Sequence, residues 1–379
     1  MKPNPKNVKL EDLIPGRCSY AALIARARTI NHLAAELGSG AISLGPNLHV
    51  LSVLDTRVLP RTGEACDLSV QQPTSRHLRA DPSRYFMVLA VSSAETRGTA
   101  PWEKAILLHR FLHMNRVRTS EWYLIKGVRS GCDFKAKSWG AVDTCRRCER
   151  FEDRELYEAP LLASAIERAF CQLSNYLQIR NEVRCSRRPH PFYRLIRSYD
   201  AWERGMHEFD AAERIHQFVR VFDGVIPETR DVGEQMRRRL TRFFRMTQSP
   251  DPNAKRLRFC PRSGEQPVEL DAMDSLIDCL RILRNKIEHL SSLNNVLPDL
   301  DEINTENSAI EPLAARAELM ASWLLGTILS RDDLWKSYRT PESTSELFSK
   351  IAKDEIDPPL PDPFELTPVP LGSSRKGEQ

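Results

Sequence analysis

Residues 268–294 read VELDAMDSLIDCLRILRNKIEHLSSLN, and their pattern decides the fold of the second half of the chain. Apolar side chains recur there at alternating steps of four and three residues, at Leu276, Leu280, Leu283, Ile287 and Leu290. This spacing is typical of an amphipathic α-helix with one apolar stripe. The sequence therefore predicts a helix over 268–294 that packs this stripe against other elements.

The neighbouring segments repeat the helical pattern. Apolar spacing of this kind predicts helices over four further ranges, 153–184, 209–226, 228–247 and 309–330. The stripe expected for the first range comprises Leu162, Ile166, Phe170, Leu173 and Leu177, and that of the third comprises Val232, Met236, Leu240, Phe243 and Phe244. In the second of these the stripe consists of Ile215, Phe218, Val219, Phe222, Val225 and Ile226, and Pro227 ends it. Long helices with short connections predict an antiparallel, all-α bundle over residues 151–340.

The rest of the chain has a different texture. SYAALIARARTINHLAAELG (19–38) and WEKAILLHRFLHMNRV (102–117) predict helices, whereas RYFMVLAVS (84–92) predicts a buried strand. Seven of the 25 prolines follow residue 340, which predicts an extended, poorly ordered tail. The expected fold is thus an α+β domain over 1–150, the helical bundle over 151–340 and a Pro-rich tail over 341–379.

The composition of the chain indicates in which cellular compartment it is expected. The chain is 41% hydrophobic and 28% charged, as expected for a globular protein, and it has no apolar run long enough for a membrane span. Its N-terminus has no apolar signal-peptide region. Nine cysteines at irregular spacing favour reduced thiols over a disulfide framework. These features predict a cytoplasmic protein without a membrane partner.

Three polar residues lie on the hydrophilic side of the 268–294 helix. At about 100° per residue, Asn285 and His289 project almost opposite the apolar stripe, and Arg284 lies to one side of it. A histidine can take the proton of an RNA 2′-hydroxyl or protonate the leaving oxygen. An arginine stabilises the charge of the phosphorane, and an asparagine can orient the phosphate. This chemistry requires no metal or cofactor.

The segment RNKIEH (284–289) resembles the R-x4-H motif of the HEPN superfamily. That resemblance implies a helical bundle that dimerises, with the motifs of both copies forming one metal-independent endoribonuclease site, as in toxins and antiphage systems. Arg284 and His289 match the defining pair, and Asn285 matches the polar neighbour. The resemblance further implies a homodimer through the 268–294 face and an N-terminal sensing or targeting domain, with a phage-derived trigger or an antitoxin as a partner.

The alternative interpretation of this segment is structural. Arg284 and Glu288 stand at i and i+4, so they are expected to form an ion pair of the kind that any exposed helix carries.

Positive charge is concentrated between Arg230 and Arg262. This stretch holds ten basic residues against three acidic ones, a net charge of +7, whereas the whole chain carries only +4. The residues expected to bind the RNA backbone lie on the 228–247 helix and are Arg237, Arg238, Arg239, Arg242 and Arg245. Such contacts would read phosphate and shape rather than sequence. A solvated, salt-laced helix face is the alternative.

Other polar clusters compete with this interpretation. Cys132, Cys145 and Cys148 would fit a zinc site at the domain junction, although a paired second half is missing, which favours reduced structural thiols. The histidine pair of HRFLH (109–113) lacks the glutamate of a zinc-hydrolase motif. RNEVRC (180–185) has a cysteine where the motif needs histidine, and His207 and His216 have no partner that the sequence reveals.

Three functions therefore remain in view. The first is the endoribonuclease. The second is an inactive helical dimer that binds nucleic acid or a partner through the basic 230–262 surface. The third is a metal enzyme built on the three cysteines and a histidine, for which the sequence offers least.

Overall fold

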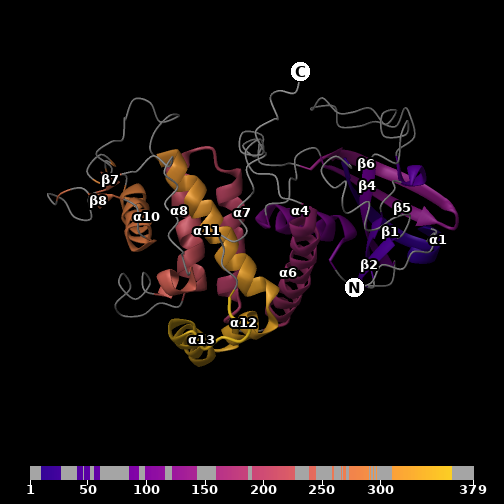
Figure 1. Cartoon of the computed structure of the whole chain (residues 1–379). Helices are drawn as coiled ribbons and strands as arrows, with labels where there is room; N and C mark the ends of the chain where they lie inside the picture. The colour runs from indigo at the N-terminus through magenta and orange to yellow at the C-terminus, as the bar shows by residue number, and fades with distance from the viewer. Residues whose placement is uncertain are drawn as a thin grey trace, which may run out of the picture. The chain divides into compact units, whose positions relative to one another are not determined.

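The computed structural model shows an antiparallel sheet early in the chain and helices after it (Figure 1). It describes residues 10–26, 41–45, 47–51, 55–59, 85–93, 99–115, 122–142, 159–186, 190–226, 239–244, 258–259, 266, 268–269, 273–289, 291, 293, 296 and 310–360. The chain divides into two compact units, one ending at Leu173 and one beginning at Ser174. The division lies inside helix α6 (Ala159–Cys185), and the domain limits expected from composition stay predictions.

The first unit is built on the sheet. In the described residues it has six strands, all paired antiparallel. Their spatial order is β2 (Ala41–Gly45), β3 (Leu48–Leu51), β4 (Tyr85–Ser93), β1 (Arg17–Arg26), β5 (Tyr123–Ser130) and β6 (Asp133–Ala141). The strand predicted over 84–92 is confirmed as β4.

Strand β1 corrects the helix predicted over 19–38. Residues 19–26 are strand, and 27–38 lie outside the described residues. Strand β1 pairs with β4 on one side and β5 on the other, and residues 20–25 are almost fully buried. A strand covered on both faces has a continuous apolar run, which over a short length cannot be told from a buried helix by periodicity. The run ALIA here is rich in good helix formers, and tertiary pairing overrides that propensity.

Each face of the sheet has its own cover. Helix α4 (Pro101–Met114) contacts β1, β4 and β5, and confirms the helix predicted from Trp102. Alternate residues on the other face form a core with α1 (Leu10–Leu13) and the 3-10 helix η2 (Thr56–Val58). That core contains Tyr20, Ala22 and Ile24 of β1.

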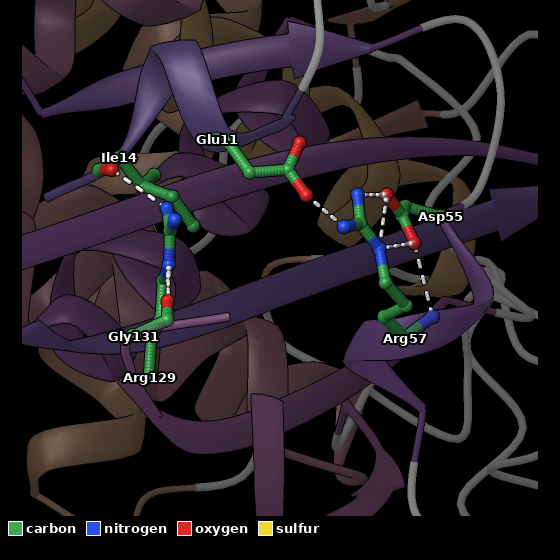
Figure 2. Close-up of polar contacts among 6 residues, drawn as sticks. All are labelled: Glu11, Ile14, Asp55, Arg57, Arg129 and Gly131. Atoms are coloured by element: carbon green, nitrogen blue, oxygen red, sulfur yellow. Dashed lines mark hydrogen bonds and ion pairs between the residues drawn. The ribbon is translucent and has the colours of Figure 1, made fainter. Parts of the chain in front are cut away.

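A buried arginine fixes the turn between β5 and β6 (Figure 2). Arg129 donates from Nη1 to the Ile14 carbonyl at 2.7 Å and from Nε to the Gly131 carbonyl at 2.7 Å. Gly131 has φ of +61°, in the left-handed region that favours glycine, and its N–H donates to the Gly16 carbonyl at 2.7 Å. Because Arg129 is 6% exposed and bonds main-chain carbonyls, its role is to hold the hairpin.

Beside it, a surface ion cluster ties η2 to α1 (Figure 2). Asp55 caps η2 by accepting from the Arg57 N–H at 3.0 Å, and its carboxylate also accepts from Arg57 Nε. The same guanidinium pairs with Glu11 of α1. Burial raises the pKa of Asp55, while the hydrogen bond from the Arg57 backbone opposes that rise. The cluster is an anchor for short elements on the sheet.

The second unit is helical. Within the residues described, it contains the C-terminal part of α6, a helical stretch at residues 239–243, a 3-10 turn η5 (Ser337–Arg339) and six further helices. These helices are α7 (Tyr193–His207), α8 (Ala211–Val225), α10 (Met273–Glu288), α11 (Ile310–Ser330), α12 (Asp332–Lys336) and α13 (Pro341–Lys353). Helix α8 contacts α7, α10 and α11 and is the centre of the unit (Figure 1). Asp210 caps it by accepting from the Glu213 N–H at 2.8 Å. The whole stripe predicted for 209–226 is buried, and α11 confirms the helix predicted over 309–330.

Helices α7 and α8 approach each other closely. A Cβ added at Gly205 would lie 2.7 Å from the Phe218 ring, and one at Gly224 would collide with the Ser198 hydroxyl. Arg194 of α7 donates to three carbonyls at the end of α8, at 2.9 to 3.1 Å. The last carbonyls of a helix lack intrahelical partners and carry negative partial charge, so this arginine caps α8.

One helix boundary and one buried stripe differ from the prediction. The helix expected over 268–294 begins only at Met273, because Val268–Glu269 (β8) pairs with Arg258–Phe259 (β7). A two-stranded ladder therefore lies in the region expected to be purely helical. In α6, Leu173 is buried as expected, but the stripe is otherwise displaced to Ala165, Ala169, Tyr176 and Ile179. Small alanines on that face hid it from a pattern based on large apolar residues.

The tail predicted from Pro341 is wrong for residues 341–353, which form α13. Pro341 occupies the first helical turn, where the missing N–H costs nothing. Thr340 and Ser343 form a capping box, and Leu347, Phe348 and Ile351 are buried. Pro341 therefore starts a helix and does not begin an extended tail. Residues 361–379 lie outside the described residues.

Candidate active site

The RNKIEH segment ends α10, on the side that packs against α8. Leu276, Leu280 and Leu283 are at most 5% exposed, as the stripe predicts, and Ile287 is half-buried. Leu290 lies outside the described residues. Ile277 and Cys279 are buried as well, so the buried face is wider than the stripe. This packing fixes the azimuth of α10 and brings its last two turns to the polar side of α8.

Arg284 is the best-held residue of the motif. Its Nη1 lies 3.1 Å from Glu288 Oε2 and donates to Asn285 Oδ1 at 3.0 Å, while Nη2 lies 3.4 Å from Asp223 Oδ2 of α8. The ion pair with Glu288 was predicted from the i, i+4 spacing and is confirmed. The side chain is 27% exposed. Two carboxylates and one amide therefore set the direction of the guanidinium.

The donor inventory of Arg284 limits what it can bind. A guanidinium has five N–H hydrogens. Nε is buried and has no hydrogen-bond partner among the described residues, and both hydrogens of Nη1 face Glu288 or Asn285. Nη2 carries two hydrogens and lies 3.4 Å from Asp223 Oδ2, which is its ion-pair partner within the described residues. Nη2 therefore keeps a donor for an incoming group such as a phosphate oxygen.

Asn285 and His289 are both exposed, as the helical projection predicts. His289 lies one residue beyond the end of α10, and its backbone N–H donates to the Asn285 carbonyl at 3.2 Å. The imidazole is thus placed in the first turn after the helix, in reach of solvent. Arg284 and Asn285 are joined by a hydrogen bond, whereas no contact between side chains joins His289 to them in the described set.

His216 contacts two carboxylates that the sequence did not identify as its partners. On α8, its Nδ1 lies 3.1 Å from Glu213 Oε1, and its Nε2 lies 3.4 Å from Glu288 Oε1. Nε2 is buried and makes no hydrogen bond within the described residues, so its contact with Glu288 is an ion pair only when the imidazole is protonated. Glu288 thus bridges His216 and Arg284, one carboxylate oxygen to each.

Asp223 and His216 were both missed from the sequence. With Glu213 they are separated by three and seven residues, a spacing that puts them on one side of α8. That periodicity was readable, but it does not say which helix packs beside α8. The contacts with Glu288 and Arg284 also show that α8 and α10 run antiparallel, because the later residue on one helix meets the earlier residue on the other.

Cys279 lies on the buried face of α10. Burial raises the pKa of its thiol to about 12, and the nearby charge of Asp278 adds to the rise. A thiol that stays protonated is a poor nucleophile. Cys279 therefore belongs to the core and contributes no chemistry to the polar face.

The basic helix is described only in part. Residues 239–243 are helical, and Leu240, Phe243 and Phe244 are buried as predicted. Arg242 is exposed, whereas the Arg239 guanidinium lies 5.7 Å from the centre of the Phe348 ring of α13. Burial lowers the pKa of Arg239. Arg237, Arg238 and Arg245 lie outside the described residues.

The competing clusters can be placed as well. His109 is buried, with its ring 5.7 Å from that of Trp122, and Cys132 is exposed in the β5–β6 turn. In the ranges that the structure describes, no three His, Cys, Asp or Glu side chains are grouped to hold a metal. Cys145 and Cys148 lie outside those ranges. RNEVRC (180–185) forms the last turns of α6, with Cys185 exposed.

The α8–α10 face combines an oriented cation, an exposed amide, an exposed imidazole and a second imidazole between two carboxylates. Such groups can bind an anionic oxygen and move protons. Among the described helices, none is both long and apolar enough to cross a bilayer. No protein-family model, curated protein or solved structure matches the chain.

Proposed function

We propose that this protein is a cytoplasmic, metal-independent endoribonuclease of HEPN type, acting as a toxin or antiphage effector. The observation that carries the proposal is the held pair of Arg284 and Asn285, hydrogen-bonded at 3.0 Å, one helical turn before the exposed His289. This pairing fixes the direction of the cation without enclosing it. The resemblance of RNKIEH (284–289) to the R-x4-H motif supplies the family.

The proposed reaction joins the RNA 2′-oxygen to the adjacent phosphorus and breaks the bond to the 5′-oxygen. His289 takes the 2′-hydroxyl proton or protonates the departing 5′-oxygen, and the Nη2 donor of Arg284 stabilises the charged phosphorane. Asn285 orients the phosphate through its amide. The products are a 2′,3′-cyclic phosphate and a 5′-hydroxyl.

One copy of the motif is half a site in this proposal. The reaction needs both a base and an acid, and one histidine cannot begin as both. A homodimer through the exposed side of α10 would supply two imidazoles and two guanidiniums. It would also supply the additional donors that a phosphate needs beyond the donor that Arg284 keeps at Nη2.

The other parts of the chain have proposed roles around this site. Arg242, together with Arg237, Arg238 and Arg245, would bind RNA phosphates, and Arg239 would hold that helix on α13 through Phe348. The N-terminal unit would sense a phage-derived trigger or bind an antitoxin.

The test is cleavage of total RNA in EDTA by the purified full-length chain. We expect cyclic-phosphate ends from the wild type, a loss of at least about 100-fold in rate for His289→Ala, and unchanged RNA retention on a gel. His113→Gln, which replaces a histidine on α4, is the matched control and should cleave like the wild type. Cleavage by His289→Ala at the wild-type rate contradicts the proposal.

The second candidate function is a nucleic-acid-binding dimer without catalysis. It is favoured by the two carboxylates at Arg284, which take up most of its donors and would oppose a phosphate. In that case the wild type and His289→Ala retard RNA equally, and neither cleaves it.

A further inference from the structure

The α8–α10 face holds a continuous line of charged groups. It runs from Asp223 to Arg284 at 3.4 Å, from Arg284 to Glu288 at 3.1 Å, from Glu288 to His216 at 3.4 Å and from His216 to Glu213 at 3.1 Å. Cations and carboxylates alternate along this line when the imidazole is charged. Only Arg284 and Glu288 belong to the motif, so α8 supplies three members that no motif predicts.

Glu288 connects the two halves of this line, because each of its two carboxylate oxygens contacts a different basic side chain. Oε2 faces Arg284, and Oε1 faces the buried Nε2 of His216. A carboxylate held at one oxygen alone can rotate about its last torsion, whereas one held at both cannot. The direction of Arg284 therefore depends on whether His216 holds the far oxygen of Glu288.

We infer that His216 is a positioning residue for the proposed cleavage, acting through Glu288 on the guanidinium of Arg284. The inference rests on the proposed function. His216 is 15% exposed and turned toward its two carboxylates, so it is not the group that meets RNA. Its effect should appear in the rate of the chemical step, where small errors in the placement of a stabilising group are costly, rather than in RNA affinity.

Loss of Glu288 could also have the opposite effect on cleavage, for a physical reason. Glu288 also withdraws one Nη1 hydrogen from any phosphate. If that competition dominated, loss of Glu288 would free the arginine, and both RNA affinity and cleavage would rise. If orientation dominates, the same change slows cleavage and leaves affinity nearly constant.

The experiment is a double-mutant cycle of His216→Ala and Glu288→Ala, read as single-turnover cleavage with full-length protein in excess over a labelled RNA. Glu288 is 36% exposed on a helix surface, so its replacement by alanine should fold. We expect each single variant to slow cleavage about tenfold, with RNA affinity within about twofold of wild type. The double variant should be no slower than the slower single variant.

Gln217→Ala is the matched control. Gln217 donates to Glu213 Oε1 at 2.7 Å from the position next to His216, so its loss disturbs the same end of the line without touching Glu288. It should cleave within about twofold of the wild type.

The outcomes separate the two proposals. RNA left intact by the wild type overturns the proposed function and this inference with it. Cleavage by the wild type with multiplicative effects in the double variant overturns the inference alone, as does faster cleavage by Glu288→Ala.

Discussion

The two sides of α8 carry arginine–carboxylate contacts of different kinds. Toward α11, Arg214 lies 3.0 Å from Glu311 and 3.1 Å from Glu318, and its side chain is only 2% exposed. Toward α10, Arg284 approaches Glu288 at 3.1 Å and Asp223 at 3.4 Å with 27% of its side chain exposed. Both arginines contact two carboxylates, but the Arg214 side chain is buried and the Arg284 side chain is partly exposed.

The difference in burial gives the two arginines different roles, one in stability and one in ligand contact. A charge almost fully buried between two carboxylates stabilises the helix pair only as long as every partner is present, and it cannot meet a ligand. A partly exposed guanidinium in a similar setting adds little to stability but keeps its direction and part of its surface. The side of α8 toward α11 is closed, and the side toward α10 is where a substrate could be bound.

The largest effect expected is on stability, from Arg214. Arg214→Met leaves Glu311 and Glu318 without their cation and should lower the free energy of unfolding by about 3 kcal/mol. Arg284→Met, the matched change on the open side, should cost at most about 1 kcal/mol. Urea denaturation followed by tryptophan fluorescence measures both. Equal losses would break the distinction between the two sides.

The α7 side of α8 offers a second, smaller test of closed packing. Gly205→Ala puts a methyl group 2.7 Å from the buried Phe218 ring and should cost about 2 kcal/mol. Gly224→Ala meets the Ser198 hydroxyl, with the Arg194 carbonyl and Ser198 Cβ at 3.4 Å. The hydroxyl can rotate away at the loss of its hydrogen bond to the Arg194 carbonyl, and alanine gains helix propensity, so this variant should cost at most about 1 kcal/mol. Urea denaturation of both variants measures these losses. A larger loss of unfolding free energy for Gly224→Ala than for Gly205→Ala would contradict the prediction.

The smallest effect is the dependence of stability on alkaline pH. Burial raises the pKa of Cys279 to about 12, and burial raises that of Tyr338, whose hydroxyl donates to the Val225 carbonyl at 2.8 Å. The unfolded chain loses the Cys279 proton above about pH 9 and the Tyr338 proton above about pH 10, while the folded chain keeps both, so stability falls as pH rises through each value. Each group should contribute at most about 1.4 kcal/mol per pH unit.

Denaturation midpoints between pH 8 and 10.5 measure this slope. Cys279→Ala and Tyr338→Phe should each make it shallower in proportion to the group removed. If both variants keep the wild-type slope of stability against pH, other groups cause the pH dependence. Cys279 and Tyr338 would then not be buried as described.

Much of the helical unit was predictable, because α8, α11 and the start of the α10 stripe follow a period that local geometry imposes. The failures have specific causes. Strand β1 is covered on both faces, so its apolar run carries no period, and the stripe of α6 uses alanine where the pattern expects large side chains. Helix α13 was not predicted, because the number of prolines after residue 340 suggested an extended tail. Pro341 lies in the first turn of the helix, where proline is accepted.

The site divides in the same way. The exposure of Asn285 and His289 and the ion pair of Arg284 with Glu288 follow from positions within one helix. Asp223 and His216 do not, because their roles depend on which helix lies beside α8. A single sequence fixes the faces of a helix, and it does not choose the neighbour of each face.

The contact of Gly205 with the Phe218 ring limits how this protein can diverge. A side chain larger than hydrogen at position 205 requires the ring at position 218 to move or to lose volume, since that ring is fully buried and lies against the site. The two positions should therefore vary as a pair among descendants that keep this helix crossing, and a homologue with alanine at the first should carry a smaller residue at the second.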